Sequence, residues 1–258
     1  MTGIDLWLGY YDEFQHDTER LLGLLSDDEQ KQAALFHFDD DRLRYIVTRA
    51  MVRTVLSRYA EVKPSDWAFE PNRYGRPGIA RQHAEAAGDL RFNLSHTRGL
   101  IVLGVMRAAE LGVDVESLER QPALSIAERY FSPVEAAELA ALKPEEQGRR
   151  FFEYWTLKES YIKALGKGIA HTLERFTFDF PSATTLRLTV DPALGDDAQR
   201  WHFWQLELGK HLLAVCAERQ VGGAPPALTL FKLKTLDDFE TLDVQPLKTS
   251  VQCARVVC

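Results

Sequence analysis

The chain has 258 residues, of which 45% are hydrophobic and 27% are charged, and its formal net charge is −7. At about 150 residues per domain, this length suits one large domain or two small ones. The composition is that of a soluble globular protein, and a chain of this size can bury a core without disulfide bonds or structural metal ions. The acidic balance argues against a nucleic-acid-binding domain, which is normally basic, but it allows a local basic pocket for a small phosphorylated molecule.

The first part of the chain is predicted to form a strand, helices and further strands. Alternating apolar residues indicate a strand over residues 4–10, and Ser26 followed by Glu29 is a capping-box signature. Apolar residues then recur at helical spacing as far as Tyr59, and Pro64 marks the end of that helix. A turn-rich segment and two strands follow, over residues 71–78, 90–94 and 100–106.

The second part of the chain repeats this order. Residues 111–115 alternate and indicate a strand. Residues 125–164 are mostly helical, with breaks at Ser132-Pro133 and Lys143-Pro144, and the last helix stops at Gly166-Lys167-Gly168. Further strands are indicated over residues 176–180, 186–190, 200–208 and 211–217.

This order of elements predicts two similar subdomains and a tail. We place the N-terminal subdomain at residues 1–107 and the C-terminal subdomain at residues 108–220. A C-terminal extension at residues 221–258 begins with a glycine- and proline-rich linker at residues 222–226 and carries no obvious chemistry.

The cysteines and the apolar runs indicate the cellular setting. An odd number of cysteines without a CxxC pair favours free thiols in a reducing, cytoplasmic environment over disulfides or a zinc site. The N-terminus has no basic lead, so no secretory signal is expected, and the longest apolar run, residues 100–106, is far too short to span a membrane. The cysteines are Cys216, Cys253 and Cys258.

The sequence lacks the common signatures of phosphate-binding loops, serine hydrolases and zinc proteases. Its most suggestive polar pair is Asp114 and Glu116, two carboxylates that point the same way from one strand. Like charges this close need a cation or water between them, and Mg²⁺ prefers carboxylate oxygens together with substrate phosphates. The alternative is a solvated outer face of the strand.

A second candidate set lies on the last predicted helix. Trp155, Glu159 and Lys163 are spaced four residues apart and therefore share one face of the helix. The carboxylate could act as a base or a metal ligand, and the ammonium as a phosphate clamp. The alternative is an ordinary surface ion pair, which contributes little stability.

Polar residues elsewhere could bind phosphate. Ser95-His96-Thr97 offers hydroxyl and imidazole donors, and Arg44 and Arg76 carry guanidinium groups, which bind phosphate in a bidentate manner. A catalytic pair of Ser95 and His96 is disfavoured because adjacent residues of an extended chain point apart. The alternatives are a polar turn and unrelated surface arginines.

Several segments of the chain follow one another in a characteristic order. They are Tyr74-Gly75-Arg76-Pro77, Phe92-Asn93-Leu94-Ser95-His96, Gly112-Val113-Asp114-Val115-Glu116, Phe131-Ser132 and Trp155-Thr156-Leu157-Lys158-Glu159-Ser160-Tyr161-Ile162-Lys163. Together they resemble the 4′-phosphopantetheinyl transferases of the surfactin type, over residues 5–217. The last two segments at their spacing are the specific part of the match.

The resemblance implies a fold and a reaction. The fold would be α+β, with two similar subdomains related by a pseudo-twofold axis, each a small mainly antiparallel sheet with helices, and with coenzyme A in the cleft between them. The reaction would transfer the 4′-phosphopantetheine arm of coenzyme A to a serine of an apo carrier protein and release adenosine 3′,5′-bisphosphate. The carriers would belong to fatty-acid, polyketide or non-ribosomal peptide synthases, and the length resembles the monomeric two-half type of the family.

The resemblance also assigns roles to residues. Asp114, Glu116 and Glu159 would bind Mg²⁺, and Glu159 would also take the proton of the carrier serine. Lys158 and Lys163 would contact phosphate oxygens, with Lys163 near the leaving phosphate. The nucleotide and its 3′-phosphate would be held by Arg44, Arg76, Ser95, His96 and Thr97.

Two further positions complete the comparison with the family. Some bacterial members place two lysines for the 3′-phosphate early in the first helix, where this chain has Glu29 and Gln32. More of the binding of that phosphate would therefore rest on the arginines and His96. Glu135 stands where family members also carry a glutamate.

Two other functions compete with transfer. The chain could be a non-catalytic module that binds carrier proteins, although such a module would not need Asp114, Glu116, Glu159 and Lys163 together. It could also be a Mg²⁺-dependent hydrolase of phosphorylated compounds. Measuring the release of adenosine 3′,5′-bisphosphate with and without a carrier would separate transfer from hydrolysis.

Overall fold

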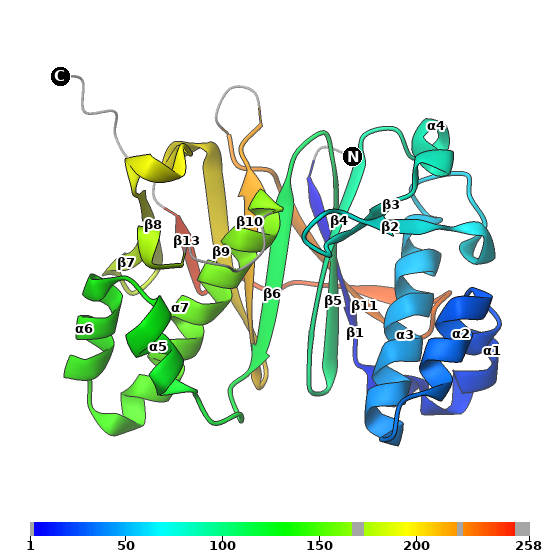
Figure 1. Ribbon diagram of the computed structural model, residues 1–258, viewed down its shortest axis with the longest axis horizontal. Helices are drawn as coiled ribbons and strands as arrows, with labels where there is room; N and C mark the ends of the chain where they lie inside the picture. Colours follow the sequence, from blue (N-terminus) through cyan, green and yellow to red (C-terminus); the bar gives the residue numbers. More distant parts are fainter. Residues whose placement is uncertain (1–2, 167–172, 221–223, 251–258) are drawn as a thin grey trace. The chain divides into compact units, whose positions relative to one another are not determined.

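The structure is a computed structural model that describes residues 3–166, 173–220 and 224–250. The chain divides into two compact units, which are unit 1 (residues 1–108 and 227–243) and unit 2 (residues 109–226 and 244–258). Each unit is α+β as predicted, with helices beside a mainly antiparallel sheet (Figure 1). The predicted turn and linker residues Lys167, Gly168, Gly222 and Gly223 lie outside the described residues, as do Cys253 and Cys258.

Unit 1 is built on a five-stranded sheet with the order β12-β11-β1-β5-β4. Its central strand β1 (Ile4–Gly9) pairs antiparallel with β5 and parallel with β11. The other strands are β4 (Leu90–Thr97), β5 (Leu100–Arg107), β11 (Leu228–Leu233), β12 (Phe239–Leu242) and the separate pair β2 (Phe69–Pro71) and β3 (Pro77–Ile79). The α-helices are α1 (Thr18–Leu22), α2 (Asp27–Ala34), α3 (Asp39–Leu56) and α4 (Ala84–Ala87).

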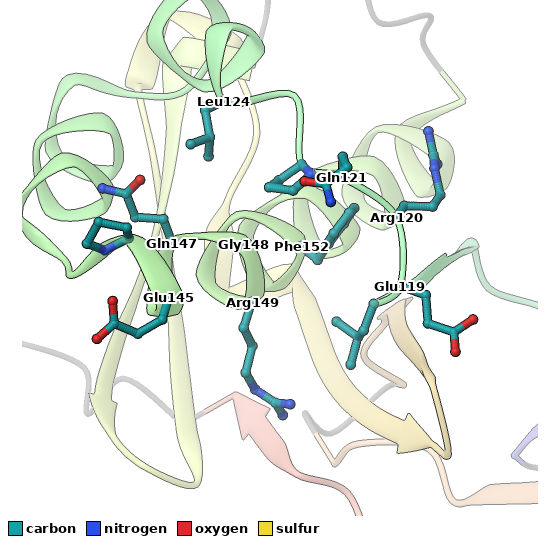
Figure 2. Close-up of a pocket in the computed structure, with 12 residues that line it drawn as sticks. Glu119, Arg120, Gln121, Leu124, Glu145, Gln147, Gly148, Arg149 and Phe152 are labelled. Atoms are coloured by element: carbon teal, nitrogen blue, oxygen red, sulfur yellow. The ribbon is translucent and has the colours of Figure 1, made fainter.

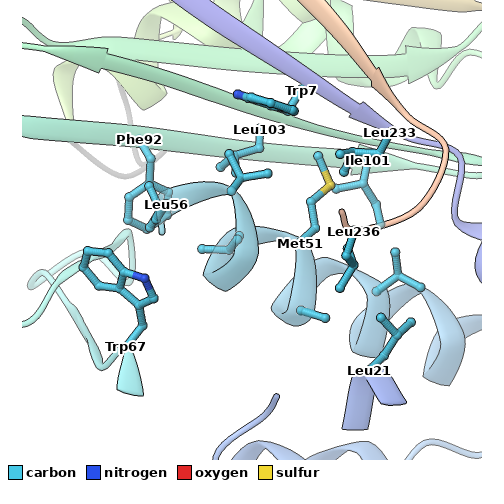
Figure 3. Close-up of a cluster of buried hydrophobic side chains, with 14 of the residues drawn as sticks. Trp7, Leu21, Met51, Leu56, Trp67, Phe92, Ile101, Leu103, Leu233 and Leu236 are labelled. Atoms are coloured by element: carbon cyan, nitrogen blue, oxygen red, sulfur yellow. The ribbon is translucent and has the colours of Figure 1, made fainter. Parts of the chain in front are cut away.

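The core of unit 1 lies between α3 and the sheet. Most apolar residues of α3 that recur at helical spacing are buried, and Met51 and Leu56 are fully so. They face Trp7, Ile101 and Leu103 of the sheet (Figure 3). Because burying one such side chain stabilises a protein by about 1.5–3 kcal/mol, this contact holds α3 firmly on the sheet.

Unit 2 contains a six-stranded sheet with the order β6-β10-β9-β13-β8-β7. The strands are β6 (Leu111–Ser117), β7 (Phe176–Ser182), β8 (Thr185–Val190), β9 (Trp201–Leu208), β10 (His211–Glu218) and β13 (Lys248–Ser250). The α-helices are α5 (Leu124–Tyr130), α6 (Pro133–Ala141) and α7 (Pro144–Leu165).

Most of the local signals that were expected to begin and end helices are confirmed. Pro64 is the exception, because α3 already ends at Leu56 and Pro64 begins a separate short 3-10 helix. A capping box between Ser26 and Glu29 starts α2. The helices α6 and α7 begin at Pro133 and Pro144, the two predicted breaks. Gly166 ends α7 with a φ of 65°, in the left-handed region that glycine adopts without strain.

The end of the chain contributes strands to both units. Strands β11 and β12 extend the sheet of unit 1, and β13 lies between β9 and β8 in unit 2. Lys248 of β13 forms a 2.8 Å ion pair with Glu153 of α7, and both residues are buried. The part of the extension that the structure describes is therefore packed into the two folds. Among the described helices, none combines the length and the hydrophobicity needed to cross a lipid bilayer.

Candidate active site in unit 2 and candidate phosphate-binding residues of unit 1

The strand β6 and the helix α7 touch at Gly112. A Cβ atom at this position would overlap the carbonyl oxygen of Ser160 and the backbone nitrogen of Ala164. Glycine therefore lets the strand and the helix approach backbone to backbone. Because alternate residues of a strand share a face, the side chains of Asp114 and Glu116 are turned toward α7 as well.

We expect Gly112→Ala to force β6 away from α7 and to lower the free energy of unfolding by at least about 1–3 kcal/mol, the usual cost of overpacking. Gly148→Ala is the matched control, because a Cβ there makes only an ordinary 3.5 Å contact with Pro122 and alanine suits a helix. Denaturant unfolding of both variants measures the difference. Equal stabilities would show that the close approach at Gly112 is not needed.

The carboxylates of β6 are paired with cations. The Nζ atom of Lys163 lies 2.7 Å from Oδ1 of Asp114 and donates a 3.0 Å hydrogen bond to the carbonyl oxygen of Val113. The Oε2 atom of Glu116 lies 2.5 Å from Nη1 of Arg120, which follows β6. The structure thus brings Lys163 to the acidic pair and adds Arg120, a residue that the sequence pattern did not single out.

Glu159 lies one helical turn before Lys163 on α7 and is buried. Burial raises its pKa to about 7; the charges of Asp114 and Glu116 act in the same direction, and that of Lys163 acts against it. Within the described residues, Oε1 of Glu159 has no hydrogen-bond donor. A buried polar atom that lacks a partner is costly, so this oxygen is available to a cation or to a substrate proton.

This donor set fits a hard divalent cation. The negative charges of Asp114 and Glu116 both raise the pKa of Glu159, so the three carboxylates interact. Mg²⁺ is bound by one or two carboxylates together with phosphate oxygens. In the described part of the chain, no group of three His, Cys, Asp or Glu side chains is arranged to hold a metal ion as it stands. Asp114 and Glu116 instead contact Lys163 and Arg120, so cation binding requires these side chains to rearrange.

The side chain of Lys158 lies in the core of unit 2 and not beside the side chain of Glu159. Its side chain is fully buried, and its Nζ atom lies 2.7 Å from Oε2 of Glu135. The same ammonium donates hydrogen bonds of 2.7 Å to the carbonyl oxygens of Leu173 and Phe176. Burial lowers the pKa of Lys158 to about 8, and the charge of Glu135 opposes this shift. Among the described residues, the ammonium of Lys158 is thus bound in the core, which differs from the phosphate contact that the resemblance implies.

Glu135 joins three elements. Its carboxylate accepts hydrogen bonds from the backbone nitrogens of Ser132 at 2.9 Å and Phe178 at 2.8 Å, in addition to its contact with Lys158. The first of these bonds belongs to the capping box of α6. The spacing Ser132-x-x-Glu135 is the sequence signal that could have identified this structural role.

Arg44 lies near the beginning of α3, in a 2.6 Å ion pair with Asp41. The hydroxyl group of Tyr11 donates to Asp40 at 3.2 Å, and the backbone of Gly99 lies close enough to this hydroxyl to act on its pKa in the lowering direction. The first turn of α3 and the turn after β4 are therefore at the same end of unit 1. This places Arg44 at the end of the unit where the predicted phosphate donors of β4 lie.

The other candidates of unit 1 lie on β4 and before β3. Ser95, His96 and Thr97 belong to strand β4, where His96 is exposed and its two neighbours are buried. Their alternation keeps the hydroxyl of Ser95 and the imidazole of His96 on opposite faces, so they form no catalytic pair. Arg76 lies in the turn before β3, which Asn72 orders by accepting two backbone hydrogen bonds with its side-chain oxygen.

Glu29 has a structural partner of its own. Its Oε2 atom lies 2.5 Å from Nη2 of Arg53, whose side chain is only 2% exposed. Arg53 also donates a 2.5 Å hydrogen bond to the carbonyl oxygen of Trp67. The acidic residue at this position thus joins α2 to α3 and to the segment before β2.

Carboxylates of a strand that face a glutamate and a lysine of a helix form a site suited to phosphoryl transfer, which depends on positioning and charge neutralisation. Comparison with protein families agrees with this interpretation. Residues 110–216 match the model of the 4′-phosphopantetheinyl transferase superfamily, and residues 9–107 match that of the N-terminal part of a 4′-phosphopantetheinyl transferase. The chain belongs to the 4′-phosphopantetheinyl transferase superfamily.

Individual relatives cover most of the chain. The 4′-phosphopantetheinyl transferase HetI of Nostoc sp. is 32% identical over 86% of this chain and 90% of its own. The 4′-phosphopantetheinyl transferase ffp of Bacillus subtilis is 32% identical over 80% of this chain and 87% of its own. The 4′-phosphopantetheinyl transferase Sfp of Bacillus subtilis strain 168 is 32% identical over 63% of this chain and 70% of its own.

One solved structure is more distantly similar to this chain. The holo-[acyl-carrier-protein] synthase of Thermotoga maritima is 23% identical, with a TM-score of 0.35. The alignment covers 43% of this chain and 64% of the Thermotoga chain. This likeness is too low to bear on the function.

Proposed function

We propose that this protein transfers the 4′-phosphopantetheine arm of coenzyme A to a serine of an apo carrier protein in a Mg²⁺-dependent reaction. The observation that carries the proposal is the buried Oε1 atom of Glu159, which has no donor among the described residues and shares its surroundings with Asp114, Glu116 and Lys163. Membership of the superfamily supports the choice of reaction.

The reaction exchanges one phosphorus–oxygen bond for another. The serine oxygen bonds to the phosphorus that carries the pantetheine arm, and the bond from that phosphorus to the bridging oxygen breaks. The bridging oxygen leaves with adenosine 3′,5′-bisphosphate, and the serine proton passes to a base. Such a transfer needs little covalent help and depends on alignment and on charge neutralisation.

The residues of unit 2 divide these tasks. Asp114, Glu116 and Glu159 would hold the Mg²⁺, whose charge would offset that of the pyrophosphate. Glu159 accepts the proton of the carrier serine. Lys163 exchanges its contact with Asp114 for the departing phosphate oxygen and offsets the charge that develops there. Lys158 has no part in this proposal, because its ammonium is bound to Glu135 in the core.

The decisive experiment is incubation of the protein with coenzyme A, Mg²⁺ and apo carriers from peptide, polyketide and fatty-acid synthases, followed by intact mass measurement of each carrier. We expect the mass of phosphopantetheine to be added to at least one carrier, and the addition to stop with EDTA and resume with added Mg²⁺. Transfer that survives thorough chelation would contradict the metal assignment. Release of adenosine 3′,5′-bisphosphate without any carrier would indicate a hydrolase.

We expect His96→Ala and Arg76→Ala to weaken coenzyme A binding, because the family resemblance assigns these two residues of unit 1 to the nucleotide and its 3′-phosphate. The effect should shrink with dephospho-coenzyme A, which lacks the 3′-phosphate, because an arginine contact to phosphate is lost only when that phosphate is present. Calorimetry with both ligands measures the difference. Arg81→Ala, an exposed residue of the same unit, is the control. Equal losses for both ligands would show that neither residue contacts the 3′-phosphate.

A further inference from the structure

Arg120 lies in an ordered turn that follows β6. Its backbone nitrogen donates a 3.1 Å hydrogen bond to the carbonyl oxygen of Ser117, and the backbone nitrogen of Glu119 donates a 3.3 Å bond to the hydroxyl of Ser117. The turn folds the chain back, so that Nη1 of Arg120 lies 2.5 Å from Oε2 of Glu116. The side chain of Glu116 is 14% exposed, whereas that of Arg120 is 57% exposed.

The two cations beside the β6 carboxylates differ in how firmly they are held. Lys163 has the carbonyl oxygen of Val113 as a second acceptor, and its side chain is 28% exposed. In the described ranges, Glu116 is the one ion-pair partner of Arg120, and that guanidinium is mostly in solvent. Exposed ion pairs contribute little stability, so the contact with Glu116 exchanges readily.

The surroundings of Arg120 leave room for such an exchange. Arg120 lines a groove of about 610 Å³ between the segment 118–124 and the first turns of α7. Figure 2 shows Arg120 on one side of this groove and Gln147 and Glu145 on the opposite side. The guanidinium can therefore leave Glu116 without displacing a packed side chain.

We propose that Arg120 is a displaceable counter-cation of Glu116, which a divalent cation must replace in order to bind. This inference rests on the proposed function, because it takes Glu116 as a ligand of that cation. Two cations at one carboxylate repel each other, so Arg120 weakens binding of the divalent ion. In return, the guanidinium reduces the repulsion among Glu116, Asp114 and Glu159 until the ion arrives.

The test is Mn²⁺ binding to the full chain without coenzyme A, measured by the electron paramagnetic resonance signal of the free ion. We expect Arg120→Gln to bind Mn²⁺ about 3- to 10-fold more tightly than the wild type, because one opposing charge is removed. Arg120→Lys keeps the charge and should stay close to the wild type. Arg129→Gln removes an exposed arginine of α5 and should leave the affinity unchanged.

Equal or weaker Mn²⁺ binding by Arg120→Gln would overturn the proposal. Asp114→Asn distinguishes this failure from failure of the metal site itself, because it removes a proposed ligand and should weaken Mn²⁺ binding by at least about 10-fold. If the wild type and Asp114→Asn bind Mn²⁺ alike, the metal site is wrong, and the role of Arg120 is wrong with it. A clear loss with Asp114→Asn and no gain with Arg120→Gln refutes only the role of Arg120.

Discussion

Glu159→Gln should lower the rate of phosphopantetheine transfer by at least about 100-fold, the lower end of what general-base catalysis contributes. The substitution keeps the size of the side chain and one oxygen, but it removes the negative charge and the basicity. Loss of a proposed metal ligand would add to the effect. Coenzyme A binding should fall much less, because Asp114 and Glu116, the other two proposed ligands, would still hold the cation.

Single-turnover transfer and calorimetric coenzyme A binding, measured on the same preparation, separate the two effects. Glu146→Gln is the matched control, because Glu146 lies on the same helix near its beginning and is exposed. It should transfer at the rate of the wild type. If Glu159→Gln also transfers within a few-fold of the wild type, Glu159 is neither the base nor an essential ligand.

Lys158→Met should lower the free energy of unfolding by about 3–5 kcal/mol, the cost of removing one partner of a buried ion pair. The substitution leaves Glu135 charged and fully buried. It also removes the donor from the carbonyl oxygens of Leu173 and Phe176. Denaturant unfolding measures the loss, and Lys143→Met, at an exposed position just before α7, should be nearly neutral.

The double variant Glu135→Gln/Lys158→Met identifies the cause. Glutamine removes the unpaired charge and keeps an acceptor for the backbone nitrogen of Phe178, so part of the lost stability should return. The folded fraction of Lys158→Met should bind coenzyme A like the wild type. Full stability combined with weakened coenzyme A binding would instead favour the phosphate contact that the family resemblance implies.

Elements with strong local signals could be predicted from the sequence. The helix α7 begins at a proline and ends at a glycine, and its apolar residues repeat at helical spacing. Strands β12 and β13 carry no comparable signal, because they span only Phe239–Leu242 and Lys248–Ser250. Short strands are stable only through pairing with partners that are distant in sequence, and such pairing cannot be read from local pattern.

The same distinction applies to the candidate site. The two-residue period of β6 and the four-residue spacing on α7 predicted which side chains share a face, and the structure brings Asp114, Glu159 and Lys163 together. Their roles in the reaction come from the family resemblance and stay a prediction. The same helical geometry separates Lys158 from Glu159. Neighbouring residues on a helix point about 100° apart, so the two side chains cannot share one face. Lys158 is buried because Glu135 and β7 cover its side of the helix. The contact between Arg120 and Glu116 is made by a turn after β6. Neither contact leaves a periodic pattern.

The chain crosses from one unit to the other three times, near residues 108, 226 and 243. During synthesis, β1 must therefore wait for β11, its parallel partner, until residues 228–233 have been made. Unpaired strand edges are prone to join other chains, so this long wait exposes the growing protein to aggregation. For the same reason a gene cut at residue 108 would not produce two self-sufficient halves. The first fragment would lack two strands of its own sheet, and the second would carry them without a sheet to join.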